Sequence, residues 1–254
     1  MKITQSTKSA GSGGRVFMLD EIRGFAIICM VIYHALFMLK SQFGVNVPVF
    51  FESWFDIIRD FFAGMFIFIS GIMCRYSHDN VRRGAVCFLI GMVITFVTPF
   101  FMEYPISFGI LHMLGIAMIL YGLFSNVLEK IPPLIGVIIF AALAAYTWNT
   151  EYGYMGFEGF LKWDIPRAAN EAGLLFPLGI VSDSYASGDY YPLLPWFFVF
   201  LAGSYMGYWF KSGSMPRMFY HSHCRWLAAV GRVTLWIYVI HAPILLGIFS
   251  LIFR

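Results

Sequence analysis

Charged side chains are scarce in this chain. Asp, Glu, Lys and Arg together make up 12% of its 254 residues, about half the share found in an ordinary soluble domain. Apolar residues make up 59%, and the mean hydropathy is +0.74. A soluble globule needs more polar surface than this, so the composition excludes a soluble enzyme, a disordered chain and a nucleic-acid binder.

Cysteine is sparse as well. The chain has four, at positions 29, 74, 87 and 224, and no two of them form a Cys-x-x-Cys pair. This excludes a disulfide-rich scaffold. The histidines inside the apolar stretches lie on different stretches, and no carboxylate stands within a helical turn of any of them, so we expect no metal site.

Long apolar runs dominate the rest of the sequence. Their lengths match a bilayer core, and in lipid such runs must be helices because the backbone has to satisfy its own hydrogen bonds. We therefore predict an all-α integral membrane protein. The polar, Ser- and Gly-rich residues 1–14 are expected to form a flexible cytoplasmic tail, and residues 15–254 a single transmembrane domain. The predicted spans are Ile22–Phe43, Trp54–Cys74, Gly84–Met102, Ile106–Val127, Pro133–Trp148, Leu193–Phe210 and Leu227–Phe253.

Basic residues predict the orientation of these spans. Most of the 17 Lys and Arg fall in segments on one side of the predicted membrane. The positive-inside rule then gives a cytoplasmic N-terminus and an outer C-terminus. The long, acidic connection 149–192 would lie outside. Its short apolar stretch, Gly173–Val181, could be a re-entrant or interfacial segment.

Three histidines fall at membrane depth, where polar groups are costly and point to function. They are His34, His112 and His241, in the first, fourth and seventh predicted spans. From the helical rise, all three lie in the middle or outer half of the membrane. A single buried His is usually a helix–helix hydrogen bond, but three at similar depth favour a shared polar cavity.

The first span carries the sharpest local pattern. Arg23 and His34 are eleven residues apart, which returns to nearly the same helix face about 16.5 Å further along the axis. A phosphate-bearing donor could keep its anionic end at Arg23 while its reactive group reaches His34, whose imidazole can take a proton. Arg23 could equally be a topology anchor paired with Asp20 or Glu21.

Further charged residues are candidates for binding at the two membrane surfaces. Basic residues predicted to be cytoplasmic could clasp phosphates or simply set the orientation: Arg75, Arg82, Arg83 and Arg232. Residues predicted to be outside could bind a polar acceptor: Asp56, Arg59, Asp60 and Asp189.

Several motifs resemble one enzyme superfamily. Leu19-Asp20-x-x-Arg23-Gly24 followed by His34 resembles the start of the membrane-bound acyltransferases, and the Arg-x10-His spacing resembles that of the type-3 acyltransferases. Three other stretches, 108–115, 189–196 and 231–243, resemble short bacterial members of the heparan-α-glucosaminide N-acetyltransferase catalytic-domain family. Larger relatives have more membrane spans than the seven predicted here, so this chain would be a smaller member of the group.

The resemblance implies an acyltransferase of the bacterial inner membrane. It would move an acyl group, expected to be acetyl, from cytosolic acetyl-CoA to a sugar or glycan acceptor on the outer face. His34 would be the general base or a transient acyl carrier, Arg23 would help to hold the donor, and His112 or His241 would orient His34 or stabilise the oxyanion.

Two other functions fit the residues. A transporter or proton-coupled permease could use the same histidines as a relay, and a non-catalytic membrane scaffold would need them only for packing. The acceptor, the acyl chain length and the oligomeric state stay open.

Overall fold

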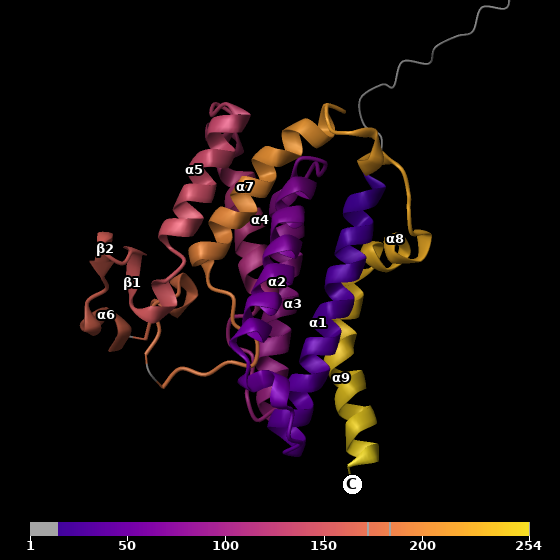
Figure 1. Ribbon diagram of the computed structural model, residues 1–254, viewed down its shortest axis with the longest axis vertical. Helices are drawn as coiled ribbons and strands as arrows, with labels where there is room; N and C mark the ends of the chain where they lie inside the picture. Colours follow the sequence, from indigo (N-terminus) through magenta and orange to yellow (C-terminus); the bar gives the residue numbers. More distant parts are fainter. Residues whose placement is uncertain (1–14, 172, 183, 254) are drawn as a thin grey trace, which may run out of the picture.

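The computed structural model describes residues 15–171, 173–182 and 184–253. The predicted tail, residues 1–14, lies outside them. Seven helices in the described residues are long and apolar enough to cross a membrane, which confirms the predicted all-α membrane class. They are formed by α1 (Phe17–Phe43), α2 (Ser53–Cys74), α3 (Asn80–Val97), α4 (Ile110–Leu128), α5 (Pro133–Tyr146), α7 (Leu193–Lys211) and α9 (Thr234–Ile252) (Figure 1). The spans of α3 and α5 continue through the following 3-10 turns to Phe100 and Tyr152.

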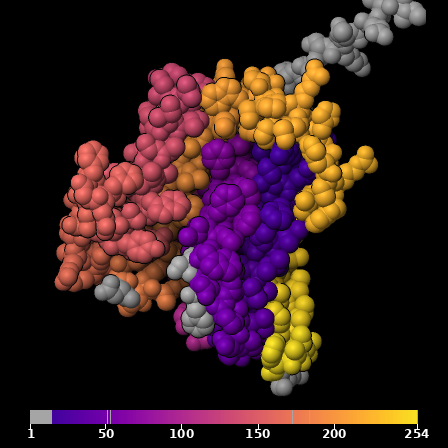
Figure 2. Space-filling model, viewed as in Figure 1, coloured from indigo at the N-terminus to yellow at the C-terminus, as the bar shows by residue number. Residues whose placement is uncertain are grey.

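The helices pack mainly as close pairs: α1 with α8, α2 with α7, α3 with α4, and α5 with α7. The core gathers around α4 and α7, the two spans with the largest buried share. Glycines allow the close approach, since a Cβ at Gly203 of α7 would collide with the backbone oxygen of Phe68 on α2. Figure 2 shows α1 and α2 at the centre of one face, with the α5 region on one side and α9 on the other.

The seventh predicted span, Leu227–Phe253, is wrong in its first part. The chain forms a short helix α8 (Arg225–Arg232), leaves helical geometry at Val233, and only then starts α9. Gly231 lies against the backbone of Asp20 in α1, so α8 packs closely on that helix and does not continue as part of the last span. The end of the bundle that holds α8 and the start of α1 is called the predicted cytoplasmic end, and the opposite one the predicted outer end.

The fourth span also starts later than predicted, at Ile110 in place of Ile106. The residues before it run extended, and Phe108 forms a parallel bridge with Tyr190 from the long connection. The backbone N–H of Ile110 donates to the Asp189 carboxylate, which satisfies one of the free donors at the helix start.

The connection 149–192 contains structure that the sequence did not predict. An antiparallel hairpin, β1 (Tyr154–Phe157) with β2 (Phe160–Asp164), lies beside the outer end of α5 and is followed by α6 (Arg167–Glu171) (Figure 1). The predicted re-entrant segment 173–181 holds only one 3-10 turn, η4 (Phe176–Leu178). The other 3-10 turns of the described chain are η1 (Pro48–Phe51), η2 (Thr98–Phe100), η3 (Thr150–Tyr152) and η5 (Arg217–Tyr220).

Candidate active site

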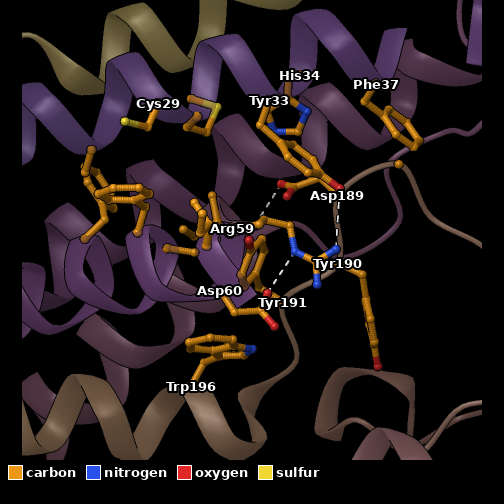
Figure 3. A pocket seen from close by; sticks show the side chains of 18 of the residues that line it. Cys29, Tyr33, His34, Phe37, Arg59, Asp60, Asp189, Tyr190, Tyr191 and Trp196 are labelled. Carbon is orange, nitrogen blue, oxygen red and sulfur yellow. Dashed lines mark hydrogen bonds and ion pairs between the residues drawn. The ribbon is translucent and has the colours of Figure 1, made fainter. Parts of the chain in front are cut away.

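A cavity of about 480 Å³ lies between α1, α2, α7 and the end of the long connection. The helical repeat of α1 turns Ile27, Met30 and His34 toward it, since these residues recur at spacings of three and four. Tyr33 and His34 point from α1 toward the segment that carries Asp189 (Figure 3). We call this space the first cavity.

His34 meets a second predicted histidine. The ring centroids of His34 and His241 are 5.2 Å apart, which joins α1 to α9. Nδ1 of His241 lies 2.5 Å from the backbone oxygen of Tyr238. A carbonyl oxygen only accepts, so Nδ1 carries the proton and Nε2 of a neutral His241 keeps a free lone pair. His34 has no hydrogen-bond partner among the described residues, and its nitrogens are available to a substrate.

Asp189 ties three parts of the chain together beside these histidines. Its Oδ2 accepts hydrogen bonds from the Tyr238 hydroxyl at 2.5 Å and from the backbone N–H of Ile110 at 3.2 Å. The side chain is buried. Burial raises the pKa of the Asp189 carboxyl, and the two hydrogen bonds oppose that rise. Asp189, which the sequence predicted as an acceptor-binding residue, therefore holds α4 and α9 in place at the wall of the first cavity.

His112 lies apart from the other two histidines. Its Nδ1 accepts from the backbone N–H of Gly109 at 3.2 Å, and its Nε2 lies 3.2 Å from the Thr95 hydroxyl. Both nitrogens are thus used, in a cap at the start of α4. Its ring is stacked on Phe108 and does not line the first cavity. Two of the three membrane histidines come together, and the third holds a helix terminus.

The predicted acceptor residues of α2 form one ion cluster. Arg59 pairs with Asp60 through Nε at 2.8 Å and with Asp56 through Nη1 at 3.0 Å. Arg59 and Asp60 line the first cavity, whereas Asp56 is exposed and does not. Glu151, which the sequence did not single out, completes this polar rim.

Arg23 faces the interior of the bundle, not lipid. Its Nη2 donates to the Thr234 hydroxyl at 2.8 Å, and its guanidinium lies 5.8 Å from the centre of the Phe66 ring. Phe66 lines the first cavity, although Arg23 itself does not. The Nε of Arg23 is buried and has no partner among the described residues. Arg23 therefore lies next to the first cavity, on the side of His34 that faces the predicted cytoplasmic end.

Of the other predicted donor cations, Arg83 lies close enough to Arg23 to act on its charge, and Arg232 ends the helix that packs against α1 beside it. Nε of Arg75 donates to the backbone oxygen of Ser204 at 2.6 Å, which uses this side chain for packing against α7. Arg82, Arg83 and Arg232 are exposed at the predicted cytoplasmic end. These three remain able to meet an anionic ligand from that side.

Comparison with models of protein families shows which family the chain belongs to. The model of the family described as "Heparan-alpha-glucosaminide N-acetyltransferase, catalytic" matches residues 15–243. The chain belongs to this family. The comparisons with curated proteins and with solved structures find no match. The matched range includes every membrane-depth histidine and every predicted binding residue.

Membership of the heparan-alpha-glucosaminide N-acetyltransferase family supports a membrane acetyltransferase. The cavity supplies residues that sequence reasoning missed, above all Tyr238, which is buried, bonds to Asp189 and precedes His241 by one helical turn. The i, i+3 spacing of Tyr238 and His241 on one helix was the available signal. Nothing in the sequence indicated that Glu151 would reach the same cavity.

Proposed function

We propose that this protein transfers an acyl group from acyl-CoA, in the first place acetyl-CoA, to a sugar or glycan acceptor on the outer side of a bacterial plasma membrane. The observation that carries the proposal is the position of His34, an unpartnered imidazole inside a cavity of a chain from an acetyltransferase family. The contact with His241 gives this imidazole a second histidine to orient it.

The donor would enter from the predicted cytoplasmic end. Its phosphates would meet the exposed Arg82, Arg83 and Arg232, and the half-buried Arg23 would attract the part of the donor that enters the bundle. The uncharged pantetheine arm would follow the α1 face past Ile27 and Met30 to His34. Arg75, whose Nε donates to the Ser204 backbone oxygen, would meet the phosphates with the two remaining nitrogens of its guanidinium.

The acceptor would enter from the predicted outer end. Arg59, Asp60 and Glu151 offer both charge signs at the rim of the first cavity, which suits the hydroxyl and amino groups of a sugar. His34 takes the proton of the attacking group and gives it to the leaving thiolate. A transient acyl-His34 is the alternative route, and acid quenching with labelled donor would trap it on the protein.

The test is acyl transfer by the purified protein with His34→Ala. Loss of a general base costs about 10²–10⁴-fold in rate, so we expect activity to fall by at least two orders of magnitude, measured as acetylated methyl glucosaminide by mass spectrometry. His78→Ala, in an exposed loop, is the matched control and should behave as the parent protein. Full activity of His34→Ala would disprove the assignment.

A further inference from the structure

A second cavity of about 620 Å³ lies between α1, α3 and α9 toward the predicted outer end. Its walls are mostly apolar, with Met38 on α1, Val93 and Val97 on α3, and Val239 and Leu246 on α9 among the lining residues. We call this space the apolar groove. The donor and acceptor routes proposed for the first cavity do not run through the apolar groove.

The apolar groove begins at the proposed reaction centre. His34, Phe37 and Tyr238 line both the groove and the first cavity, and His241 lines the groove. A molecule whose reacting carbonyl lies at His34 therefore has two ways to extend. One leads along the first cavity, and the other leads into the groove.

The polarity of the two spaces differs. The first cavity carries Arg59, Asp60 and Glu151, whereas no Asp, Glu, Lys or Arg lines the apolar groove within the described chain. Two of the polar side chains in its lining already bond to the backbone, Ser41 to the Phe37 oxygen and Gln42 to the Phe101 oxygen. Such a lining offers a sugar few partners for its many hydroxyls, whereas a hydrocarbon chain would bury apolar surface.

We infer that the apolar groove holds the hydrocarbon chain of the donor's acyl group, so that the enzyme transfers acyl groups longer than acetyl. This inference rests on the proposed function. In the transfer, the acceptor oxygen or nitrogen forms a bond to the thioester carbonyl carbon while the carbon–sulfur bond breaks. The acceptor proton passes through His34 to the thiolate, which leaves as free CoA thiol. Donor and acceptor supply every atom, and no other reactant is needed.

Gly247 is a position at which a larger side chain would fill the apolar groove. It lies on α9 six residues beyond His241, about 9 Å further along the helix. A Cβ at this position would meet no atom within 4 Å, so Gly247→Phe adds a ring to the groove without displacing backbone. Val93→Trp fills the same groove from α3 and serves as an independent second variant. Ile248→Phe is the matched control, because Ile248 is exposed and does not line the groove.

The experiment measures transfer from acetyl-CoA and from dodecanoyl-CoA to methyl glucosaminide. We expect the parent protein to use both donors, and the ratio of dodecanoyl to acetyl transfer to fall at least tenfold in Gly247→Phe and Val93→Trp. The ratio should stay unchanged in Ile248→Phe. Binding of the ethyl and dodecyl thioether analogues of the donors should show the same ordering.

Two results would overturn the inference while leaving the proposed function intact. The parent protein could transfer acetyl only, or the filled grooves could lower both transfers equally, as expected if only membrane lipid occupies the groove. A parent protein that transfers neither group would overturn the proposed function and this inference with it.

Discussion

Asp189 is the residue on which the geometry around the paired histidines depends. Its carboxylate receives one hydrogen bond from α9, through Tyr238, and one from the start of α4, through Ile110. Removing such an acceptor leaves two buried donors without a partner. Asp189 thus contributes by position, since it holds the helix that carries His241.

The first prediction compares Asp189→Ala with Asp189→Asn. Asp189→Ala should lower the free energy of unfolding by about 1–3 kcal/mol because both donors lose their acceptor, a shift of about 2–4 °C in the unfolding midpoint per kcal/mol. Asp189→Asn keeps an oxygen for both donors and should cost less. Thermal unfolding of the purified protein in detergent measures the difference, and equal midpoints for both variants would contradict the role.

The same residue predicts a pH dependence. The pKa of Asp189 is raised in the folded protein, so the folded state binds the proton more tightly than the unfolded chain does. The free energy of unfolding should therefore fall as pH rises from the ordinary Asp value to the raised one. Asp189→Asn lacks this titration, and its unfolding midpoint should fall less over the same interval.

At the scale of elements, α8 is a short helix that packs against α1 and is not itself one of the membrane spans. Its N-terminus is capped by Glu21 of α1, whose Oε1 accepts from the backbone N–H groups of His223 and Cys224 and from the Ser222 hydroxyl at 2.7–2.9 Å. A carboxylate at a helix N-terminus also opposes the positive end of the helix dipole. The buried Glu21 therefore locks α8 across α1 at the predicted cytoplasmic end.

We predict that Glu21→Ala loosens α8. The variant should lose about 1–3 kcal/mol of stability because three donors lose a charged acceptor, and Cys224, at the start of α8, should react faster with a maleimide. Glu21→Gln keeps an oxygen acceptor and should show a smaller change. Glu129→Ala, an exposed carboxylate at the same end, is the control. An unchanged Cys224 reaction rate in Glu21→Ala would argue against the lock.

At the scale of the whole molecule, the chain is a bundle with two chemically different spaces on either side of one histidine pair. The first cavity has a charged outer rim, and the apolar groove opens among helix faces that lie at membrane depth. The orientation of the bundle decides which compartment supplies each substrate. From the distribution of Lys and Arg, the positive-inside rule predicts that α8 is cytoplasmic and that the β1–β2 hairpin is outside.

Single cysteines test this orientation in a background without the four natural ones. Glu158→Cys in the hairpin should react with a membrane-impermeant maleimide on intact cells. Ser214→Cys, after α7, should react only once the membrane is permeabilised. The opposite pattern would contradict the predicted orientation, because the proposed donor-binding end would then face away from the cytoplasm.

The amino-acid sequence by itself determined that seven helices span the membrane, though not all of their ends, because a backbone in lipid must form its hydrogen bonds within a long helix. It also determined which face of α1 carries Ile27 and His34, because the helical repeat fixes the direction of each side chain. These features depend on local geometry and on the surrounding medium alone.

Only the tertiary structure decided which of these side chains meet. Depth along a helix does not say which helices are neighbours, so the pairing of His34 with His241, and the use of His112 as a cap, required the packed bundle. The contact of Arg75 with Ser204 and that of Gly231 with Asp20 depend on the same packing. Close contacts between helices distant in sequence depend on the fit of whole surfaces, which no short pattern of residues encodes.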